Sequence, residues 1–191
     1  MLEYIVTSKT RRKILAFFYS NLDAWYHMRR IGREVDEEIN AVKRELDILE
    51  KASLLKKERR LNKMLYSLND KYLFFHEFLA IFTKSAPLAQ KFIKNVSRLG
   101  KVKAIAMSEK FALKTKILDS EIYMLIIGTV VVSEVADIVK SQQDDFPHEI
   151  NYTVMTADEF VFRKKNKDPF IWNFLLQPKI MILGSEQELL S

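Results

Sequence analysis

The first third of the sequence carries basic and amide side chains whose spacing suits contact with nucleic acid. Asn40, Lys43 and Arg44 fall on one face of a helical pattern. In the major groove asparagine can bond adenine, and arginine can bond guanine, through two hydrogen bonds. A second basic set suits phosphate contacts, and it comprises Lys56, Lys57, Arg59, Arg60 and Lys63 together with Arg11 and Arg12. Any one of them could be an ordinary solvated charge, but the set predicts double-stranded DNA as the partner.

The charge balance points to the same part of the chain. Residues 1–84 contain 17 Lys and Arg against 12 Asp and Glu, whereas residues 85–191 contain 14 against 13. The excess positive charge therefore lies where a polyanion is expected to bind. Asp36, Glu37 and Glu38 oppose this charge, and they either stabilise the first turn of a helix through its dipole or select cytosine.

The elements that would position these side chains follow one another closely. The pattern first predicts a helix Thr10–Tyr19 capped by Ser8 or Thr7, an extended piece Trp25–Met28 and a short helix Arg29–Val35. A longer helix follows, capped by Asp36, and it buries Ile39, Val42, Leu46 and Leu49. Two strands, Leu54–Arg59 and Lys63–Leu68, then form a hairpin with Asn62 as the turn residue. This order is typical of a winged helix-turn-helix.

An aromatic-rich segment follows the predicted hairpin. Lys71–Lys84 is expected to be helical and is apolar around most of its circumference, so one face should pack on its own domain and another elsewhere. Phe74, Phe75, Phe78 and Phe82 favour a dimer interface or core over a ligand pocket. Leu88–Leu99 continues helical until Gly100. We therefore expect a DNA-binding domain over residues 1–70, linking and dimerisation helices over 71–99, and a third region over 100–191.

The pattern changes in the second half to alternating strands and helices. Strands are expected at Val102–Met107, Glu121–Ile127 (closed by Gly128), Ile150–Met155 and Lys179–Leu183, and helices at Ser133–Gln143, Ala157–Lys164 (capped by Thr156) and Asp168–Leu176. These elements predict a small α/β domain, and the chain as a whole is expected to be α+β.

Several other kinds of site are not expected. The chain has no Cys, so disulfides and zinc–thiolate sites are excluded. His27, His76 and His148 are too widely spaced to suggest a metal site, and the sequence contains neither a Gly-rich phosphate loop nor a Gly-x-Ser-x-Gly pattern. We therefore predict no metal and no cofactor. The start of the chain is not a signal peptide, and Ile122–Val132 is too short to span a bilayer, so a soluble, cytoplasmic protein is expected.

Two resemblances follow from these residues. Ser8–Arg11 ahead of Ile14-Leu15, then Ile31–Glu34, Asn40–Leu46 and Leu49–Leu55, resemble the arsenic-repressor-type winged helices of bacteria and archaea over roughly residues 5–70. The resemblance implies a dimeric DNA-binding regulator. The metal-sensing cysteines of that family are absent here, so a metal response is not implied.

The second half, over roughly residues 100–185, resembles the minimal nucleotidyltransferase domain. In that family one strand ends in Gly-Ser, and a second carries an Asp-x-Asp pair that can hold catalytic metal ions. Here the first position reads Met107-Ser108, and the carboxylate pair reads Glu121 and Tyr123. The resemblance therefore implies a domain that has kept the fold and lost the reaction.

The favoured hypothesis is a homodimeric transcriptional regulator, not an enzyme, whose degenerate second domain dimerises, senses a ligand or docks a partner. An active nucleotidyltransferase is the main alternative, and an antitoxin-like module that binds a partner protein is another. Any small-molecule effector is left open.

Overall fold

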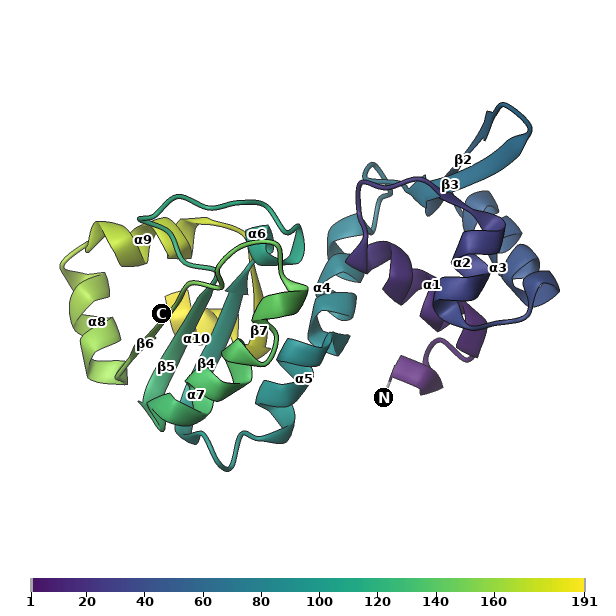
Figure 1. Ribbon diagram of the computed structural model, residues 1–191. Coiled ribbons are helices and arrows are strands. Elements are labelled where there is room, and N and C mark those ends of the chain that lie inside the picture. Colours follow the sequence, from purple (N-terminus) through teal and green to yellow (C-terminus); the bar gives the residue numbers. More distant parts are fainter. Residues whose placement is uncertain (1, 191) are drawn as a thin grey trace. The chain divides into compact units, whose positions relative to one another are not determined.

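The computed structural model describes residues 2–190 and divides into two compact units, with the boundary between Phe82 and Thr83 (Figure 1). Each unit has its own sheet, and helices outnumber strands in both. The α+β class expected from the sequence is therefore confirmed. No helix within the described residues is both long enough and apolar enough to cross a membrane.

The amino-terminal unit consists of helices around a small antiparallel sheet of order β1-β3-β2. Its elements are η1 (Leu2–Tyr4), α1 (Lys9–Ser20), β1 (Tyr26–His27), α2 (Met28–Val35), α3 (Ile39–Lys51), β2 (Leu55–Arg60), β3 (Lys63–Leu68) and most of α4 (Phe75–Ser85). Ser8 caps α1, its hydroxyl accepting the amide of Arg11.

The core of this unit follows from helical spacing. Val42, Leu46 and Leu49 repeat at intervals of four and three, so they share one face of α3, and that face is buried against α1 and α2. Ile14 and Ile31 contribute fully buried side chains from those two helices. The opposite face of α3 is thereby left to solvent.

The junction between α2 and α3 differs from the prediction. Asp36 ends α2 in the left-handed region (φ 48°), and the cap of α3 is Glu38, whose Oε2 accepts the amides of Asn40 and Ala41. Predicting Asp36 as the cap was therefore wrong by two residues, because the chain uses Asp36 to turn. Ile39 was expected to be buried, but as the first residue of α3 it lies at the open end of the core and is 37% exposed.

The hairpin is confirmed, and Asn62 lies in its turn as predicted. Arg60 pairs with Lys63, which leaves a loop of two residues. The first central residue of the favoured two-residue loops takes a positive φ, and that position belongs to Leu61 (φ 53°) rather than Asn62. Strand β2 accordingly runs one residue later than predicted.

Helix α4 begins at Phe75, not at Lys71. Residues 69–74 form successive turns, in which Asn69 accepts the amide of Tyr72 through its carbonyl and donates its side-chain amide to Ser53. The expectation that one face packs on its own domain is confirmed: the Tyr19 ring of α1 stacks on Phe82 with centroids 5.1 Å apart.

The carboxy-terminal unit is a four-stranded sheet of order β6-β5-β4-β7 with helices on it. Strands β5 and β6 are parallel, and the other pairs are antiparallel. Its elements are α5 (Pro87–Lys94), β4 (Gly100–Ser108), α6 (Glu109–Ala112), β5 (Met124–Val130), α7 (Val132–Lys140), η2 (Gln143–Asp145), β6 (Tyr152–Met155), α8 (Ala157–Lys165), α9 (Pro169–Leu176), β7 (Lys179–Leu183) and α10 (Glu186–Leu190).

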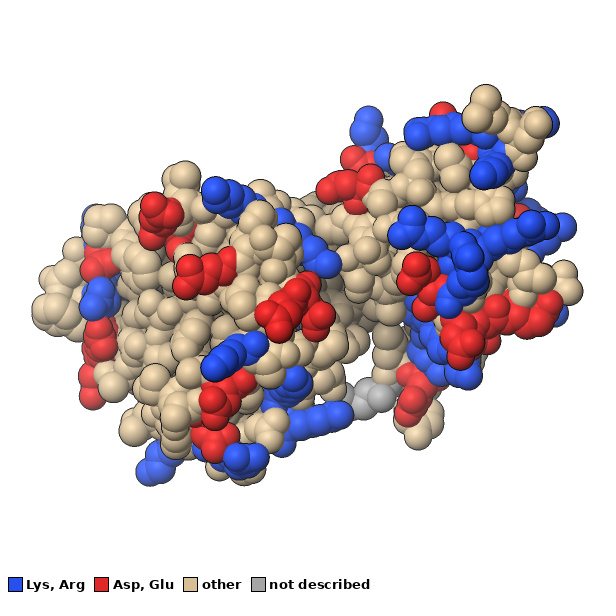
Figure 2. Space-filling view, viewed as in Figure 1, with Lys and Arg blue, Asp and Glu red and all other residues tan. Residues whose placement is uncertain are grey.

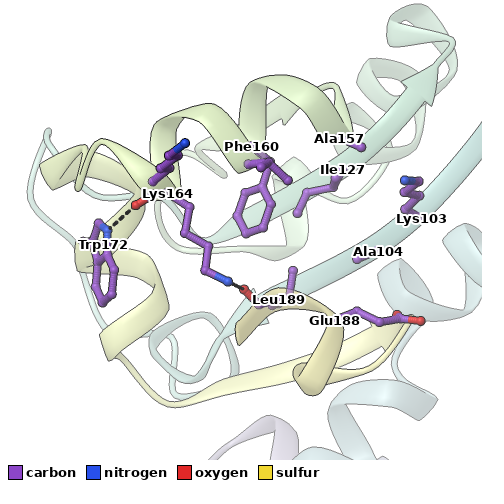
Figure 3. A pocket seen from close by; sticks show the side chains of 11 residues that line it. Lys103, Ala104, Ile127, Ala157, Phe160, Lys164, Trp172, Glu188 and Leu189 are labelled. Atoms are coloured by element: carbon purple, nitrogen blue, oxygen red, sulfur yellow. Dashed lines mark hydrogen bonds between the residues drawn. The ribbon is translucent and has the colours of Figure 1, made fainter. Parts of the chain in front are cut away.

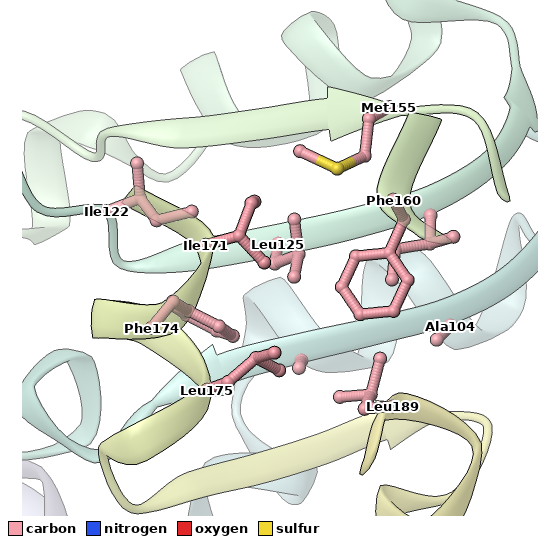
Figure 4. Close-up of a cluster of buried hydrophobic side chains, with 11 residues drawn as sticks. Ala104, Ile122, Leu125, Met155, Phe160, Ile171, Phe174, Leu175 and Leu189 are labelled. Carbon is pink, nitrogen blue, oxygen red and sulfur yellow. The ribbon is translucent and has the colours of Figure 1, made fainter. Parts of the chain in front are cut away.

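One face of this sheet packs against α8, α9 and α10 (Figure 4). Alternation along the strands sends Leu125 and Ile127 to this face and leaves Met124 and Ile126 buried on the other. Burial on both faces explains why β5 reads as a continuous apolar run.

Several predictions for this unit are confirmed. Strand β7 has the predicted bounds, and Thr156 caps α8 by accepting the amide of Glu159. The helix predicted over Asp168–Leu176 is α9, which begins at Pro169 with Asp168 as its cap. Helix α5 ends at Lys94 rather than at Leu99, since residues 95–98 form turns.

The boundaries of the second predicted strand were wrong at both ends. Glu121 precedes β5, which starts at Met124 and continues through Gly128 to Val130. Gly128 has φ +146°, and a Cβ there would stand 2.2 Å from the Lys101 carbonyl oxygen. This glycine marks a close approach of two strands rather than the end of one.

Candidate nucleic-acid interface

The exposed face of α3 is the centre of the candidate site. Asn40, Lys43 and Arg44 are all exposed there, as the sequence predicted, because α3 packs into the core through its opposite face. Within the described residues, no carboxylate lies within ion-pair distance of Lys43 or Arg44. Their donors therefore remain available to a ligand.

The acidic residues ahead of α3 are bound within the unit. Glu37 is 15% exposed at its side chain, with Oε1 2.8 Å from Lys13 Nζ and Oε2 accepting a hydrogen bond from the Thr10 hydroxyl. The hydrogen bond from Lys13 lowers the pKa of Glu37. The two amides that Glu38 accepts at the start of α3 lower the pKa of that carboxyl also. Both residues thus stay ionised and serve the fold, which supports the helix-stabilising alternative over selection of cytosine.

The ion pair of Glu37 predicts an acid-sensitive contact between α1 and the turn before α3. A group with a lowered folded pKa stabilises the fold above its unfolded pKa of about 4.3, and the contribution is lost as pH falls through the folded pKa. Glu37→Gln should therefore lower Tm at pH 7, and the difference from the parent should shrink as the pH falls below the ordinary glutamate pKa of about 4.3. Trp25 fluorescence in a Trp172→Phe background reports this unit.

Glu34→Gln is the matched control, since the Glu34–Arg30 pair is solvent-exposed on both sides. We expect no change in Tm for it. An equal loss for Glu37→Gln at pH 7 and at acidic pH would contradict the ionic contribution.

Arg11 and Arg12, predicted to contact phosphates, hold the start of the unit together. Arg11 Nε donates to Glu45 Oε2 at 2.7 Å, and the Ser8 hydroxyl donates to the other oxygen of Glu45. Arg12 donates to the carbonyls of Val6 and Thr7. The contacts of Glu45 join α3 to the start of α1, whereas Arg12 binds the segment just before α1, so both guanidinium groups are already engaged.

The basic hairpin residues fall into two groups. Three have partners in the unit: Lys56 pairs with Asp70, Lys57 Nζ lies 3.5 Å from Asp47, and the Arg60 guanidinium donates twice to Glu58 at 3.0 Å. Arg60 also stacks over Trp25, 5.0 Å from the ring centroid.

Arg59 and Lys63 form the other group. Both are exposed, and neither has a carboxylate within 4 Å among residues 2–190. These two side chains are therefore the strongest candidates for phosphate contacts on the hairpin.

The structure adds residues that the sequence interpretation missed. A surface hollow of about 910 Å³ is bordered by α2, the start of α3 and β3, and Arg29, Arg33, His27 and Lys63 line it. Figure 2 shows Lys and Arg gathered over α2 and the hairpin, with acidic residues beside them. The run Met28-Arg29-Arg30-Ile31-Gly32-Arg33 carried this signal, since a helix places residues 29 and 33 on one face.

The positions expected to mark a degenerate nucleotidyltransferase lie at one end of β4 and β5. Met107 is 1% exposed and pairs with Met124 and Ile180. Ser108 is equally buried, and its hydroxyl caps α6 by accepting the amide of Phe111. Ser108 thus has a structural role here.

Glu121 and Tyr123 do not form a pair of ligands. Glu121 accepts hydrogen bonds from Lys110, Gln177 and the Leu118 amide, and the contact with Lys110 is the main cause of its lowered pKa. Tyr123 is fully buried, its hydroxyl donates to the Thr115 carbonyl at 2.9 Å, and burial raises its pKa. The structure therefore places one engaged carboxylate and one neutral phenol at these positions.

No cluster of three or more acidic or histidine side chains suited to a metal ion occurs within the described part of the chain. No family model, curated protein or solved structure matches this chain.

Proposed function

We propose that the amino-terminal unit is a winged helix-turn-helix of the arsenic-repressor type and that the protein is a sequence-specific, DNA-binding transcriptional regulator. This rests mainly on the exposed face of α3, where Asn40, Lys43 and Arg44 lie beside a basic hairpin and neither Lys43 nor Arg44 has an ion-pair partner among residues 2–190. In this arrangement α3 enters the major groove and reads bases, while the hairpin lies along the phosphates.

The contacts before α3 support this docking. Glu37 is bound to Lys13 of α1, so its charge is neutralised near the groove-facing helix. Arg29, Arg33 and Lys63 line the adjoining hollow together with Asp36, Glu37 and Glu38, so its three cations are further candidates for contacts with the DNA backbone.

Selection of bound sequences from random duplex DNA with the purified chain tests the proposal. We expect enrichment of one motif in two half-sites, with affinity that falls steeply as salt rises. Binding without any enriched motif would contradict a sequence-specific regulator.

The proposal includes a homodimer, because one small module buries less surface than tight specific binding requires. Leu73 and Phe74, just before α4, are 80% and 49% exposed, and they offer apolar surface for a second copy. Leu73→Glu with Phe74→Glu should give a monomer by light scattering and weaken DNA binding at least about tenfold. Leu118→Glu, which charges a leucine in the other unit that is 69% exposed, is the control and should change neither the mass nor DNA binding. A parent protein that is monomeric with and without DNA would contradict the dimer.

We further propose that the carboxy-terminal unit has a nucleotidyltransferase-like fold without that activity. Phosphoryl transfer needs metal ions held between carboxylates. The three donors on Glu121 and the buried phenol of Tyr123 support a loss of that chemistry.

A further inference from the structure

The carboxy-terminal unit contains a cavity of about 730 Å³ beside the middle of β4 and β5 (Figure 3). This volume is in the range of small-molecule sites, which are lined mainly by apolar side chains with a few placed polar groups. Ala104, Ile127, Phe160 and Leu189 form its apolar wall.

A β-bulge presents Lys103 to this cavity. Val102 pairs with Gly128 and Ala104 with Ile127, so Lys103 is an extra residue without a partner in β5. Consecutive residues of a regular strand point to opposite faces, yet Lys103 and Ala104 both line the cavity. The bulge explains this, since bulges redirect side chains and are common next to functional sites.

Glycines make room for the bulge on both sides. A Cβ at Gly128 would stand 3.1 Å from the Lys103 amide nitrogen and 2.2 Å from the Lys101 carbonyl oxygen, and one at Gly184 would stand 2.8 Å from the Lys103 carbonyl oxygen. Two of the four glycines in the chain therefore fit the backbone around one lysine.

Helix α8 forms the facing wall. Ala157, Phe160, Val161, Lys164 and Lys165 line the cavity at intervals that place them on one helical face. The helix thus offers apolar surface in its first turns and amines in its last.

Most polar groups of the cavity are already satisfied. Lys164 Nζ donates to the Leu189 carbonyl at 2.9 Å, Trp172 Nε1 donates to the Lys164 carbonyl at 3.0 Å, and Glu188 accepts the Ser185 amide at 2.9 Å. Among the described residues no carboxylate lies within 4 Å of the amines of Lys103 and Lys165.

We propose that this cavity binds a small apolar carboxylic acid, whose hydrocarbon body packs against Ile127, Phe160 and Leu189 and whose carboxylate pairs with Lys103 or Lys165. Apolar walls supply the affinity, and the two amines are the charges that a monoanion complements. The proposal does not depend on DNA binding.

Calorimetric titration with decanoate, compared with the neutral decan-1-ol, tests it. Trp172 lines the cavity, so its fluorescence in a Trp25→Phe background should change with the same saturation curve as the calorimetric titration.

Lys103→Met and Lys165→Met should each weaken decanoate binding about threefold to fivefold, as expected for exposed ion pairs, and leave the affinity for decan-1-ol unchanged. Lys140→Met, at the end of α7, is the matched control. Ala157→Phe should abolish binding of both probes by filling the cavity.

Saturable decanoate binding that weakens in both lysine variants supports the site. Equal affinity for decanoate and decan-1-ol, or unchanged affinity in both lysine variants, would overturn the assignment of an acid. Absence of binding at millimolar decanoate would overturn the site itself. A change of mass for Ala157→Phe in light scattering, without decanoate binding by the parent, would assign the cavity to a second copy of the chain instead. Thermal melts confirm that each variant is folded.

Discussion

Arg44→Ala is expected to weaken binding to the preferred duplex by about 1–3 kcal/mol and to relax the choice of base at one position of each half-site. Its guanidinium is exposed on the groove-facing side of α3 and has no ion-pair partner in the described residues. Asn40→Ala should behave similarly at another position, because its amide lies on the first turn of the same face.

Substitutions in the hairpin should change DNA affinity in a different way. Arg59→Ala and Lys63→Ala should weaken binding to all sequences alike and flatten the dependence of log affinity on log salt by about one unit each. The sequence alone offered Lys57 and Arg60 equally for this test, but their partners Asp47 and Glu58 would be released by the substitution. Substituting Lys57 or Arg60 would therefore remove a cation and also leave an unpaired carboxylate, and the two effects on DNA affinity could not be separated.

Affinities for the selected site and for single-base variants, measured at several salt concentrations, separate the two effects. Lys140→Ala in the other unit is the control and should change neither specificity nor slope. If Arg44→Ala and Arg59→Ala lose affinity uniformly across all duplexes, α3 does not read bases.

Local patterns in the sequence were enough to predict most elements of both units. The spacing of Val42, Leu46 and Leu49 specifies one face of α3, and Thr156 is a strong capping residue, so both predictions were confirmed. The predictions that were wrong concerned residues whose roles depend on tertiary contacts. Glu38 rather than Asp36 caps α3 because the chain must first turn after α2.

Gly128 shows the same limit in the second unit. A glycine at the end of an apolar run is a reasonable strand terminator, but the tight approach of Lys101 and Lys103 that requires it comes from a bulge in β4. The sequence could not predict the cavity at Lys103, because this bulge places the lysine there.

The sequence predicted which residues of the candidate site are exposed, but it did not predict which of them form ion pairs. Arg11 and Glu45 are 34 positions apart, so the contact that engages this arginine follows only from the packing of α1 on α3. Separating available from engaged basic residues therefore required the tertiary structure.

Tyr123→Asp is expected to destabilise the carboxy-terminal unit by at least about 3 kcal/mol rather than to recreate a metal site. The ring of Tyr123 is fully buried, with Phe111 and Phe146 at centroid distances of 5.9 and 5.2 Å. Its loss leaves a cavity, and the new carboxylate would be buried without a cation to pair it. Tyr123→Phe keeps the ring and loses only the bond to Thr115, so about 1 kcal/mol is expected. Trp172 fluorescence, in a Trp25→Phe background, follows unfolding of this unit.

Activity measurements on the parent and on Glu121→Gln test the proposed absence of phosphoryl transfer. Phosphoryl transfer depends on metal ions held close to the reacting phosphate. Here Tyr123 is packed among aromatic rings, Lys110 and Gln177 both donate to Glu121 Oε1, and the Leu118 amide donates to Oε2. The parent protein should therefore transfer no label from radiolabelled nucleoside triphosphates in magnesium, and Glu121→Gln should change nothing. A transfer rate in the parent that disappears in Glu121→Gln would contradict an inactive unit. A Tyr123→Asp variant with an unchanged Tm would contradict the structural role of Tyr123, because a ring that can be replaced by a carboxylate at no cost is not part of the core.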